Sequence, residues 1–195
     1  MSVSALTAYS NTMDDRASLA RTAWRTLSTR SIYVNPWIRV REDSAQLPDG
    51  RTTIYGVVEC KPCIGVLPFL DSDTVVLVGQ YRYVARGFYW EMPTGAMHPG
   101  ETEEAAVQRE LTEEAGYVAK RLTLLCSFFT SKSVVDETAS LYLAEGLTPV
   151  GHRPDPTEFI EIRTFSFAEV IRMVETGEIK DAMTVIGVLH AARRR

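Results

Sequence analysis

Residues 95–117 of this chain read GAMHPGETEEAAVQRELTEEAGY, and their charge and spacing dominate the interpretation of the sequence. Residues 101–117 hold six of the 25 acidic residues but one of the 21 basic residues, so the net charge of −4 is concentrated here. The pattern predicts a helix over residues 101–115, because Gly116 follows at the position where many helices end. Such a helix carries a dense negative charge at one place on the molecule.

Three acids of this helix project from one face. Glu110, Glu113 and Glu114 stand at positions i, i+3 and i+4, so their carboxylates repel one another. A hard cation with oxygen ligands, Mg²⁺ or Mn²⁺, turns that repulsion into coordination. Arg109 precedes Glu113 by four residues and can brace one carboxylate while the others meet metal. A solvated acidic surface is the plainer alternative for a run of charge.

The same stretch resembles the Nudix box, which reads Gly, five residues, Glu, seven residues, Arg-Glu-aliphatic-any-Glu-Glu-any-Gly-aliphatic. The positions that match at this spacing are Gly95, Glu101, Arg109, Glu110, Leu111, Glu113, Glu114 and Gly116. Tyr117 departs from the pattern because it is aromatic where the box has an aliphatic residue. With eight matching positions in 23 residues, the chain is identified as Nudix-like.

The resemblance implies an α+β fold, an α/β/α sandwich in which a mixed sheet lies between helices and the box forms a loop–helix–loop. It also implies hydrolysis of a nucleoside diphosphate linked to another group, with a divalent metal and water. Carried over to this chain, the metal ligands are Glu110 and Glu114, joined by Glu113 as a ligand or base. Glu101 is an outer acid, and the Thr94 carbonyl completes the metal shell. Gly95, Arg109 and Gly116 have structural roles in the motif.

The residues that precede the box indicate a particular branch of the family. Gln80-Tyr81-Arg82 and the segment from Trp90 to Gly95 resemble signatures of ADP-ribose pyrophosphatases and related nucleoside diphosphate sugar hydrolases. In that branch the arginine at the position of Arg82 contacts the nucleotide, and a guanidinium suits phosphate or a stacked ring. The alternative is an arginine exposed at a strand end. The favoured reaction is Mg²⁺-dependent cleavage of ADP-ribose to AMP and ribose 5-phosphate.

Downstream residues offer two candidates for a catalytic acid or base. Residues 155–161 resemble the segment that supplies this group in several pyrophosphatases, which makes Glu158 the first candidate and Glu137 the second. Either could instead be a solvated turn residue. Residues 130–135 read TSKSVV, without the Pro and Gly common in these relatives, so the substrate stays open. Other candidate substrates are GDP-mannose, NADH, FAD and dinucleoside polyphosphates, and a non-catalytic sensor of ADP-ribose is the rival of another class.

The N-terminal part of the chain predicts a small β-structure ahead of the Nudix domain. We expect a tail over residues 1–30, a β-hairpin region over residues 31–60, and the Nudix domain over residues 61–195. Within the tail, Asp14 and Asp15 can start a short helix that runs to Arg25 and includes Trp24 at near-helical spacing from other apolar residues. Pro48-Asp49-Gly50 is the turn of the hairpin. The resemblance implies that this region forms a homodimer and that Tyr55 and Trp37 stack on the base. Strand aromatics that only fill a core or an interface are the alternative.

Composition excludes several classes of protein. Of the 195 residues, 45% are hydrophobic and 24% charged, as in an ordinary globular protein. The net charge of −4 argues against binding to nucleic acid, and no apolar stretch is long enough to span a bilayer. Three cysteines and no secretory signal predict a cytoplasmic protein. Cys60 and Cys63 have the spacing of a zinc or redox pair, but no further ligand stands at a matching spacing.

Further elements follow from periodicity and turn residues. We expect strands over residues 32–34, 37–41, 52–58, 63–70, 74–83, 122–129, 139–144 and 159–165, and helices over residues 166–175 and 181–194. Residues 146–157 are polar and predict a loop.

Overall fold

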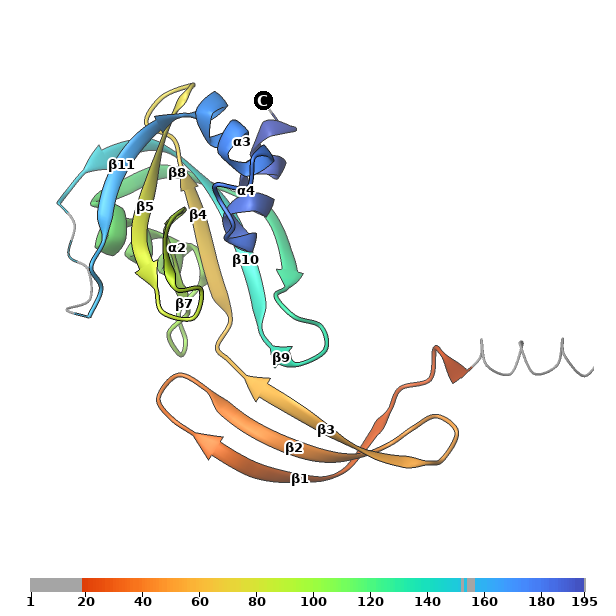
Figure 1. Cartoon of the computed structure of the whole chain (residues 1–195). Helices are drawn as coiled ribbons and strands as arrows, with labels where there is room; N and C mark the ends of the chain where they lie inside the picture. Colours follow the sequence, from red (N-terminus) through yellow and green to blue (C-terminus); the bar gives the residue numbers. More distant parts are fainter. Residues whose placement is uncertain (1–18, 152, 154–156, 195) are drawn as a thin grey trace, which may run out of the picture. The chain divides into compact units, whose positions relative to one another are not determined.

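A computed structural model describes residues 19–151, 153 and 157–194 of the chain (Figure 1). The chain divides into two compact units. The first comprises the residues up to Cys60 together with Ser131–Asp136, and the second comprises Lys61–Thr130 and Glu137–Arg195. Among the described residues, no helix has both the length and the apolar character needed to cross a membrane.

The first unit is built on one four-stranded sheet. Its strands are β1 (Arg25–Val34), β2 (Arg39–Gln46), β3 (Thr52–Glu59) and β9 (Val135–Asp136), in the order β1-β2-β3-β9. β2 and β3 form the predicted antiparallel hairpin, and Gly50 takes the positive φ of 86° that its tight turn requires. β9 pairs with β3 in parallel, so a segment distant in sequence completes the sheet.

The N-terminal helix was predicted to run to Arg25, but in the structure this residue already belongs to a strand. Residues 14–18 of that helix lie outside the described residues, but Arg25, its expected last residue, begins β1. β1 pairs with β2 from Arg25 opposite Gln46 to Val34 opposite Arg39. β-branched residues recur along β1, at Thr26, Thr29, Ile32 and Val34, and favour its extended backbone.

The second unit contains two sheets. One is mixed, with the order β7-β4-β10-β8, and the other is antiparallel, with the order β11-β5-β6. The strands of the first are β4 (Cys63–Pro68), β7 (Thr94–Ala96), β8 (Tyr117–Phe129) and β10 (Thr138–Pro149). The strands of the second are β5 (Thr74–Arg82), β6 (Gly87–Glu91) and β11 (Glu161–Ser166). β10 runs parallel to β4 and antiparallel to β8.

Helices cover both faces of these strands (Figure 1). They are α2 (Glu103–Glu110), continued by the π-helical turn η1 (Leu111–Ala115), then α3 (Phe167–Glu175) and α4 (Ala182–Ala192). Successive residues of one strand enter different clusters: Val66 packs with residues of α2, whereas Leu67 packs with residues of α3 and α4. This alternation is what a strand buried on both sides requires. The predicted α+β fold is confirmed.

The two C-terminal helices begin one residue after their expected starts, and a side chain caps each of them. Ser166 accepts a hydrogen bond from the Glu169 N–H at the start of α3, and Asp181 accepts one from the Thr184 N–H at the start of α4. Two strands of the second unit are longer than expected. β8 begins at Tyr117 and β10 continues to Pro149, because the two pair along one antiparallel ladder that includes part of the predicted polar loop.

Candidate active site

The acidic helix of the box begins and ends at defined residues. Thr102 caps α2 by accepting a hydrogen bond from the Ala105 N–H at 3.2 Å. The helix then widens into η1, where the Thr112 hydroxyl donates to the Gln108 carbonyl oxygen at 2.8 Å. Gly116 ends the turn with a φ of 78°, the left-handed conformation that favours glycine. The π-helical turn therefore carries Glu113 and Glu114.

Two polar side chains of this helix fix it on the mixed sheet. The Gln108 side chain donates to the Ala119 carbonyl oxygen at 2.6 Å and accepts from the Ala119 N–H at 3.0 Å, as a neighbouring strand would. On the other side, Glu103 accepts hydrogen bonds from the Tyr142 hydroxyl at 2.7 Å and the Ser140 hydroxyl at 3.0 Å. Burial and Glu103 together raise the pKa of Tyr142, so its hydroxyl stays a donor.

Arg109 holds three of the box glutamates. It donates through Nε and Nη2 to Glu101, both at 3.0 Å, and through Nη1 to Glu110 at 2.6 Å and to Glu113 at 3.1 Å. Nη2 also donates to the Ala96 carbonyl oxygen at 3.0 Å, which connects the helix to β7. The hydrogen bonds from Arg109 lower the pKa of Glu101 to about 2. Arg109 thus organises the carboxylates rather than bracing one of them alone.

Glu110 and Glu114 lie buried, and this burial is costly for two carboxylates one helical turn apart. Burial raises the pKa of Glu110. Burial, followed by the charge of Glu110, raises the pKa of Glu114 to about 8, although the Thr94 N–H donates to its Oε2 at 3.0 Å. The two side chains therefore lie where added positive charge would be stabilising.

Gly95 must be a glycine for these glutamates to fit. It lies on β7, opposite Ile64 of β4, and a β-carbon at this position would overlap the Glu110 carboxyl group. The glycine of the box therefore provides the space that Glu110 occupies.

The carboxylates suit a hard divalent cation by their chemistry. Within the described part of the chain, no group of three or more acidic, histidine or cysteine side chains is arranged to hold a metal ion. Arg109 bonds to three of the glutamates, which is consistent with this result. Buried carboxylates with raised pKa values nonetheless fit such an ion, since Mg²⁺ is commonly bound by one or two carboxylates together with substrate phosphates.

Arg82 and Glu91 form an ion pair beside these glutamates. Nε of Arg82 lies 3.0 Å from both carboxylate oxygens of Glu91, and Nη2 lies 2.6 Å from Oε2. The hydrogen bonds of Glu91 raise the pKa of Arg82, with smaller contributions from the charges of Glu114 and Asp181. Arg82 is half-exposed, whereas the Glu91 side chain is only 5% exposed. Arg82 therefore lies within electrostatic reach of the box.

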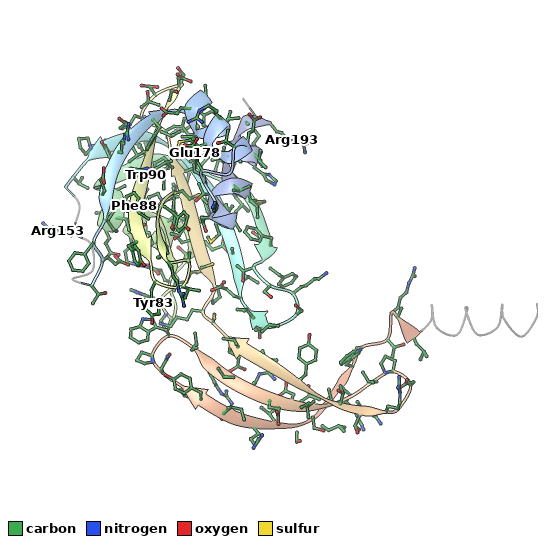
Figure 2. The ribbon with its side chains drawn as sticks, in the orientation of Figure 1. Tyr83, Phe88, Trp90, Arg153, Glu178 and Arg193 are labelled. Atoms are coloured by element: carbon green, nitrogen blue, oxygen red, sulfur yellow. The ribbon has the colours of Figure 1, made fainter. Side chains whose placement is uncertain are left out.

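The β5–β6 hairpin that carries this pair is an antiparallel ladder, and aromatic side chains pack along β6. Phe88 and Trp90 of β6, labelled in Figure 2, meet edge to face with ring centroids 5.4 Å apart, and Trp90 packs on Phe165 of β11 at 5.1 Å.

A cavity of about 310 Å³ lies beside the Arg82–Glu91 pair. It is lined by Arg82, Ala85, Tyr89, Glu91, Thr94, Lys180 and Asp181. The sequence had indicated Arg82 and Thr94 among these, but not the pairing with Glu91 or the presence of Lys180.

The two candidates for a catalytic acid or base differ in position. The negative charge of Glu158 contributes to the raised pKa values of both Glu110 and Glu114, so the three carboxylates lie in one electrostatic environment. Glu137 lies directly before β10, where its carbonyl oxygen accepts from the Thr130 N–H at 3.3 Å. For Glu137, the described residues give no comparable relationship to the box. Glu113, with a side chain 42% exposed, is the most accessible of the clustered box glutamates that Arg109 bonds.

The two aromatic residues expected to stack on a base have different environments within the first unit. Tyr55 lines a cavity of about 320 Å³ with Trp24, Thr26, Asp43 and Ala45, and its hydroxyl donates to the Ser133 carbonyl oxygen at 2.6 Å. Trp24 meets Tyr55 edge to face at 5.9 Å. Trp37 lies in the turn between β1 and β2, is 76% exposed, and is not among the residues of this cavity. The predicted N-terminal helix included Trp24, so its place beside Tyr55 in this cavity was not predicted.

Comparisons with known proteins identify the family of the chain. The family model of the NUDIX domain matches residues 61–185, and that of the nucleoside diphosphate sugar hydrolase N-terminal domain matches residues 24–58. The chain therefore belongs to the Nudix family. It is a pyrophosphohydrolase of that family, with an N-terminal unit of the kind found in nucleoside diphosphate sugar hydrolases.

Individual relatives cover most of the chain. It is 30% identical over 168 residues to an ADP-ribose pyrophosphatase of Bacillus subtilis (strain 168), covering 85% of this chain and 91% of the relative. It is 29% identical over 174 residues to an ADP-ribose pyrophosphatase of Mycobacterium tuberculosis, covering 88% and 84%. A crystal structure of an ADP compounds hydrolase has the same fold, with a TM-score of 0.79 at 19% identity over 89% of this chain and 94% of that one.

Proposed function

We propose that this enzyme hydrolyses the pyrophosphate bond of ADP-ribose or a related nucleoside diphosphate sugar, releasing AMP, or another nucleoside monophosphate, and a sugar phosphate. The observation that carries the proposal is the Arg82–Glu91 pair in a cavity that also includes Thr94, whose N–H binds Glu114. The cavity thus joins a cation suited to an anionic substrate with the acidic centre of the Nudix box. The relatives named as ADP-ribose pyrophosphatases support the choice of substrate.

Arg82 is the proposed contact to the substrate. Its pair with Glu91 uses Nε and Nη2, so Nη1 is not needed for that pair and can donate to a phosphate oxygen. Glu91 fixes the direction of the guanidinium before the substrate arrives. A cation held in place in this way loses little conformational entropy on binding.

Glu110 and Glu114, with the Thr94 carbonyl oxygen, are the proposed ligands of Mg²⁺, or of Mn²⁺. When bound, the metal ion polarises a phosphoryl oxygen and makes a coordinated water more acidic. Glu101 contributes by fixing Arg109, which in turn holds Glu110 and Glu113. Gly95, Arg109 and Gly116 keep their structural roles.

A carboxylate must accept the proton of the attacking water, and three remain candidates. Glu113 is accessible at the box, Glu158 shares the electrostatic environment of Glu110 and Glu114, and Glu137 remains a proposal from the resemblance. The proton acceptor needs a position within hydrogen-bond distance of the water and a suitable pKa. A comparison of the pH–rate profiles of the three Glu→Gln variants identifies the acceptor. Replacing the glutamate that accepts the proton removes the fall in rate at low pH, because that fall comes from its protonation.

The N-terminal unit has a proposed role in assembly and base binding. We propose that it forms a homodimer and that Tyr55, next to Trp24, stacks on the nucleobase, with Trp37 as a further candidate. We expect the enzyme in the cytoplasm, with no nucleic acid or membrane partner, in line with its net charge and three cysteines.

A substrate panel with product identification tests the proposal. The purified chain is incubated with Mg²⁺ and, separately, ADP-ribose, GDP-mannose, UDP-glucose, NADH, FAD or a diadenosine polyphosphate, and products are separated by chromatography. Formation of AMP and ribose 5-phosphate in equal amounts supports the proposal. Preferential cleavage of another compound would support pyrophosphate hydrolysis but replace ADP-ribose as the proposed substrate. Binding of ADP-ribose without turnover, with Mn²⁺ also tried, would contradict the enzymatic proposal.

A further inference from the structure

The cavity lined by Arg82 has a second positively charged side chain in its wall. Lys180 lines this cavity from the segment between α3 and α4, together with Arg82, Glu91 and Thr94. Its side chain is exposed, and it belongs to none of the motifs found in the sequence. Its presence in the same cavity as the proposed substrate contact makes it a candidate for binding.

The backbone at Lys180 is held on both sides. Ile179, directly before it, is buried in the core, and its N–H donates to the Met173 carbonyl oxygen of α3 at 3.0 Å. Asp181, directly after it, caps α4 by accepting from the N–H and the hydroxyl of Thr184, each at 2.7 Å. Lys180 therefore projects from a fixed position on the molecule.

The same contacts connect Lys180 to the proposed active site. The Met92 N–H donates to the hydroxyl oxygen of Thr184 at 3.0 Å, and this hydroxyl is fully buried. Met92 follows Glu91 directly and precedes Thr94 by two residues. A chain of hydrogen bonds thus runs from the segment carrying Glu91 and Thr94, through Thr184, to the residue after Lys180.

The charges in the cavity explain what Lys180 can add. Arg82 is paired with the buried carboxylate of Glu91, and Asp181 uses one carboxylate oxygen to cap α4. A pyrophosphate that enters here brings further negative charge, and an ammonium group is a compact, strongly attracting partner for phosphate oxygens.

We propose that Lys180 is a substrate-binding residue whose ammonium group contacts a phosphate oxygen of the pyrophosphate and sets the affinity of the enzyme for its substrate. The inference rests on the proposed function, since it assigns Lys180 to the same anionic substrate as Arg82. Lys180 acts in binding and takes no part in proton transfer.

Kinetics of two Lys180 variants test this. Lys180→Met removes the charge and keeps much of the side-chain length, whereas Lys180→Arg keeps the charge. With ADP-ribose and saturating Mg²⁺, Lys180→Met should raise KM about tenfold while kcat stays within about twofold. This is the result expected when the lost contact holds the bound substrate and the transition state equally strongly. Lys180→Arg should recover most of the loss. Lys120→Met, at an exposed lysine on β8, is the matched control and should leave KM unchanged.

Binding in an inactive background separates this inference from the proposed reaction. Calorimetry with ADP-ribose and Mg²⁺ should give a Kd about tenfold higher for Glu114→Gln/Lys180→Met than for Glu114→Gln alone. Weaker binding by the double variant, with no turnover by the native enzyme, would support Lys180 while contradicting hydrolysis. Turnover by the native enzyme, with KM and Kd unaffected by Lys180→Met, would overturn the assignment of Lys180 while leaving hydrolysis intact. A native chain that neither binds nor cleaves ADP-ribose would overturn both.

Discussion

The guanidinium of Arg109 holds the carboxylate of Glu101 through two hydrogen bonds, from Nε to Oε1 and from Nη2 to Oε2, each 3.0 Å long. The pair spans the start and the end of the acidic helix, and the same guanidinium reaches Glu110 and Glu113. Glu101 thus controls the position of the cation that organises the box. Its role is to position Arg109.

This pair predicts a specific pH dependence of stability. Because Arg109 lowers the pKa of Glu101 from 4.5 to about 2 in the folded state, the pair stabilises the fold above pH 4.5. That stabilisation is lost as the pH falls from 4.5 toward 2. Urea unfolding at several pH values should show that Glu101→Gln loses less stability over this window than the native chain. Glu104→Gln, on the exposed first turn of α2, should behave like the native chain, and an equal loss in Glu101→Gln would contradict the role of the pair.

The raised pKa of Glu114 predicts the opposite dependence in the absence of metal. A carboxyl group with a pKa near 8 when folded and 4.5 when unfolded binds more protons in the folded state between these values. The stability of the metal-free protein should therefore fall as the pH rises from about 5 to 8. Thermal unfolding in EDTA should show a smaller fall for Glu114→Gln, and Mg²⁺ should raise the Tm more at pH 8 than at pH 6. A Tm that responds equally to Mg²⁺ at both pH values would argue against Glu114 as a ligand.

Replacing Arg82 should affect both binding and stability. Arg82→Ala removes a substrate contact and leaves the buried Glu91 carboxylate without this partner, which costs about 1–3 kcal/mol of unfolding free energy. We expect KM for ADP-ribose to rise at least tenfold. The double variant Arg82→Met/Glu91→Leu should recover much of the stability but not the KM, because it removes the buried charge without restoring a cation. Recovery of the KM by the double variant would show that Arg82 acts only structurally.

Gly95 is the most sensitive position of the box in steric terms. Gly95→Ala places a β-carbon where the Glu110 carboxyl lies, so Glu110 must move or the strand must shift. We expect a loss of kcat of at least a hundredfold and a cost in unfolding free energy of about 1–3 kcal/mol, measured by turnover and urea unfolding. Gly56→Ala on β3, where a β-carbon meets no atom within 4 Å, is the control for adding a methyl group. Normal turnover by Gly95→Ala would contradict the close approach of Glu110.

The sequence predicted much of the second unit because its signals are local. The spacing of the box glutamates and Gly116 after the helix each act within a few residues along the chain. The π-helical turn η1 was not predicted, because the spacing of the box residues does not distinguish it from a regular helical turn. In the structure the Thr112 hydroxyl lies 2.8 Å from the Gln108 carbonyl oxygen and 3.2 Å from the Tyr117 carbonyl oxygen.

Contacts between distant residues were the part that the sequence did not reveal. β9 joins β3 through Val135 opposite Val58, a pairing that no local pattern indicates. Lys180 lines the same cavity as Arg82 because buried hydrogen bonds of Thr184 connect α4 to the segment after β6. Trp24 was assigned to a helix by its spacing from other apolar residues, whereas the structure has it beside Tyr55.

The central claim is that the glutamates of the box support hydrolysis of a nucleoside diphosphate sugar. The most direct measurement is the rate of AMP release from ADP-ribose with Mg²⁺, for the native chain and for Glu114→Gln side by side. We expect steady release of AMP with an equal amount of ribose 5-phosphate from the native chain. We expect Glu114→Gln to remain folded and to lose this activity by a factor of about a hundred or more. No AMP from the native chain, or equal rates from the two proteins, would contradict the role of the box glutamates in this hydrolysis.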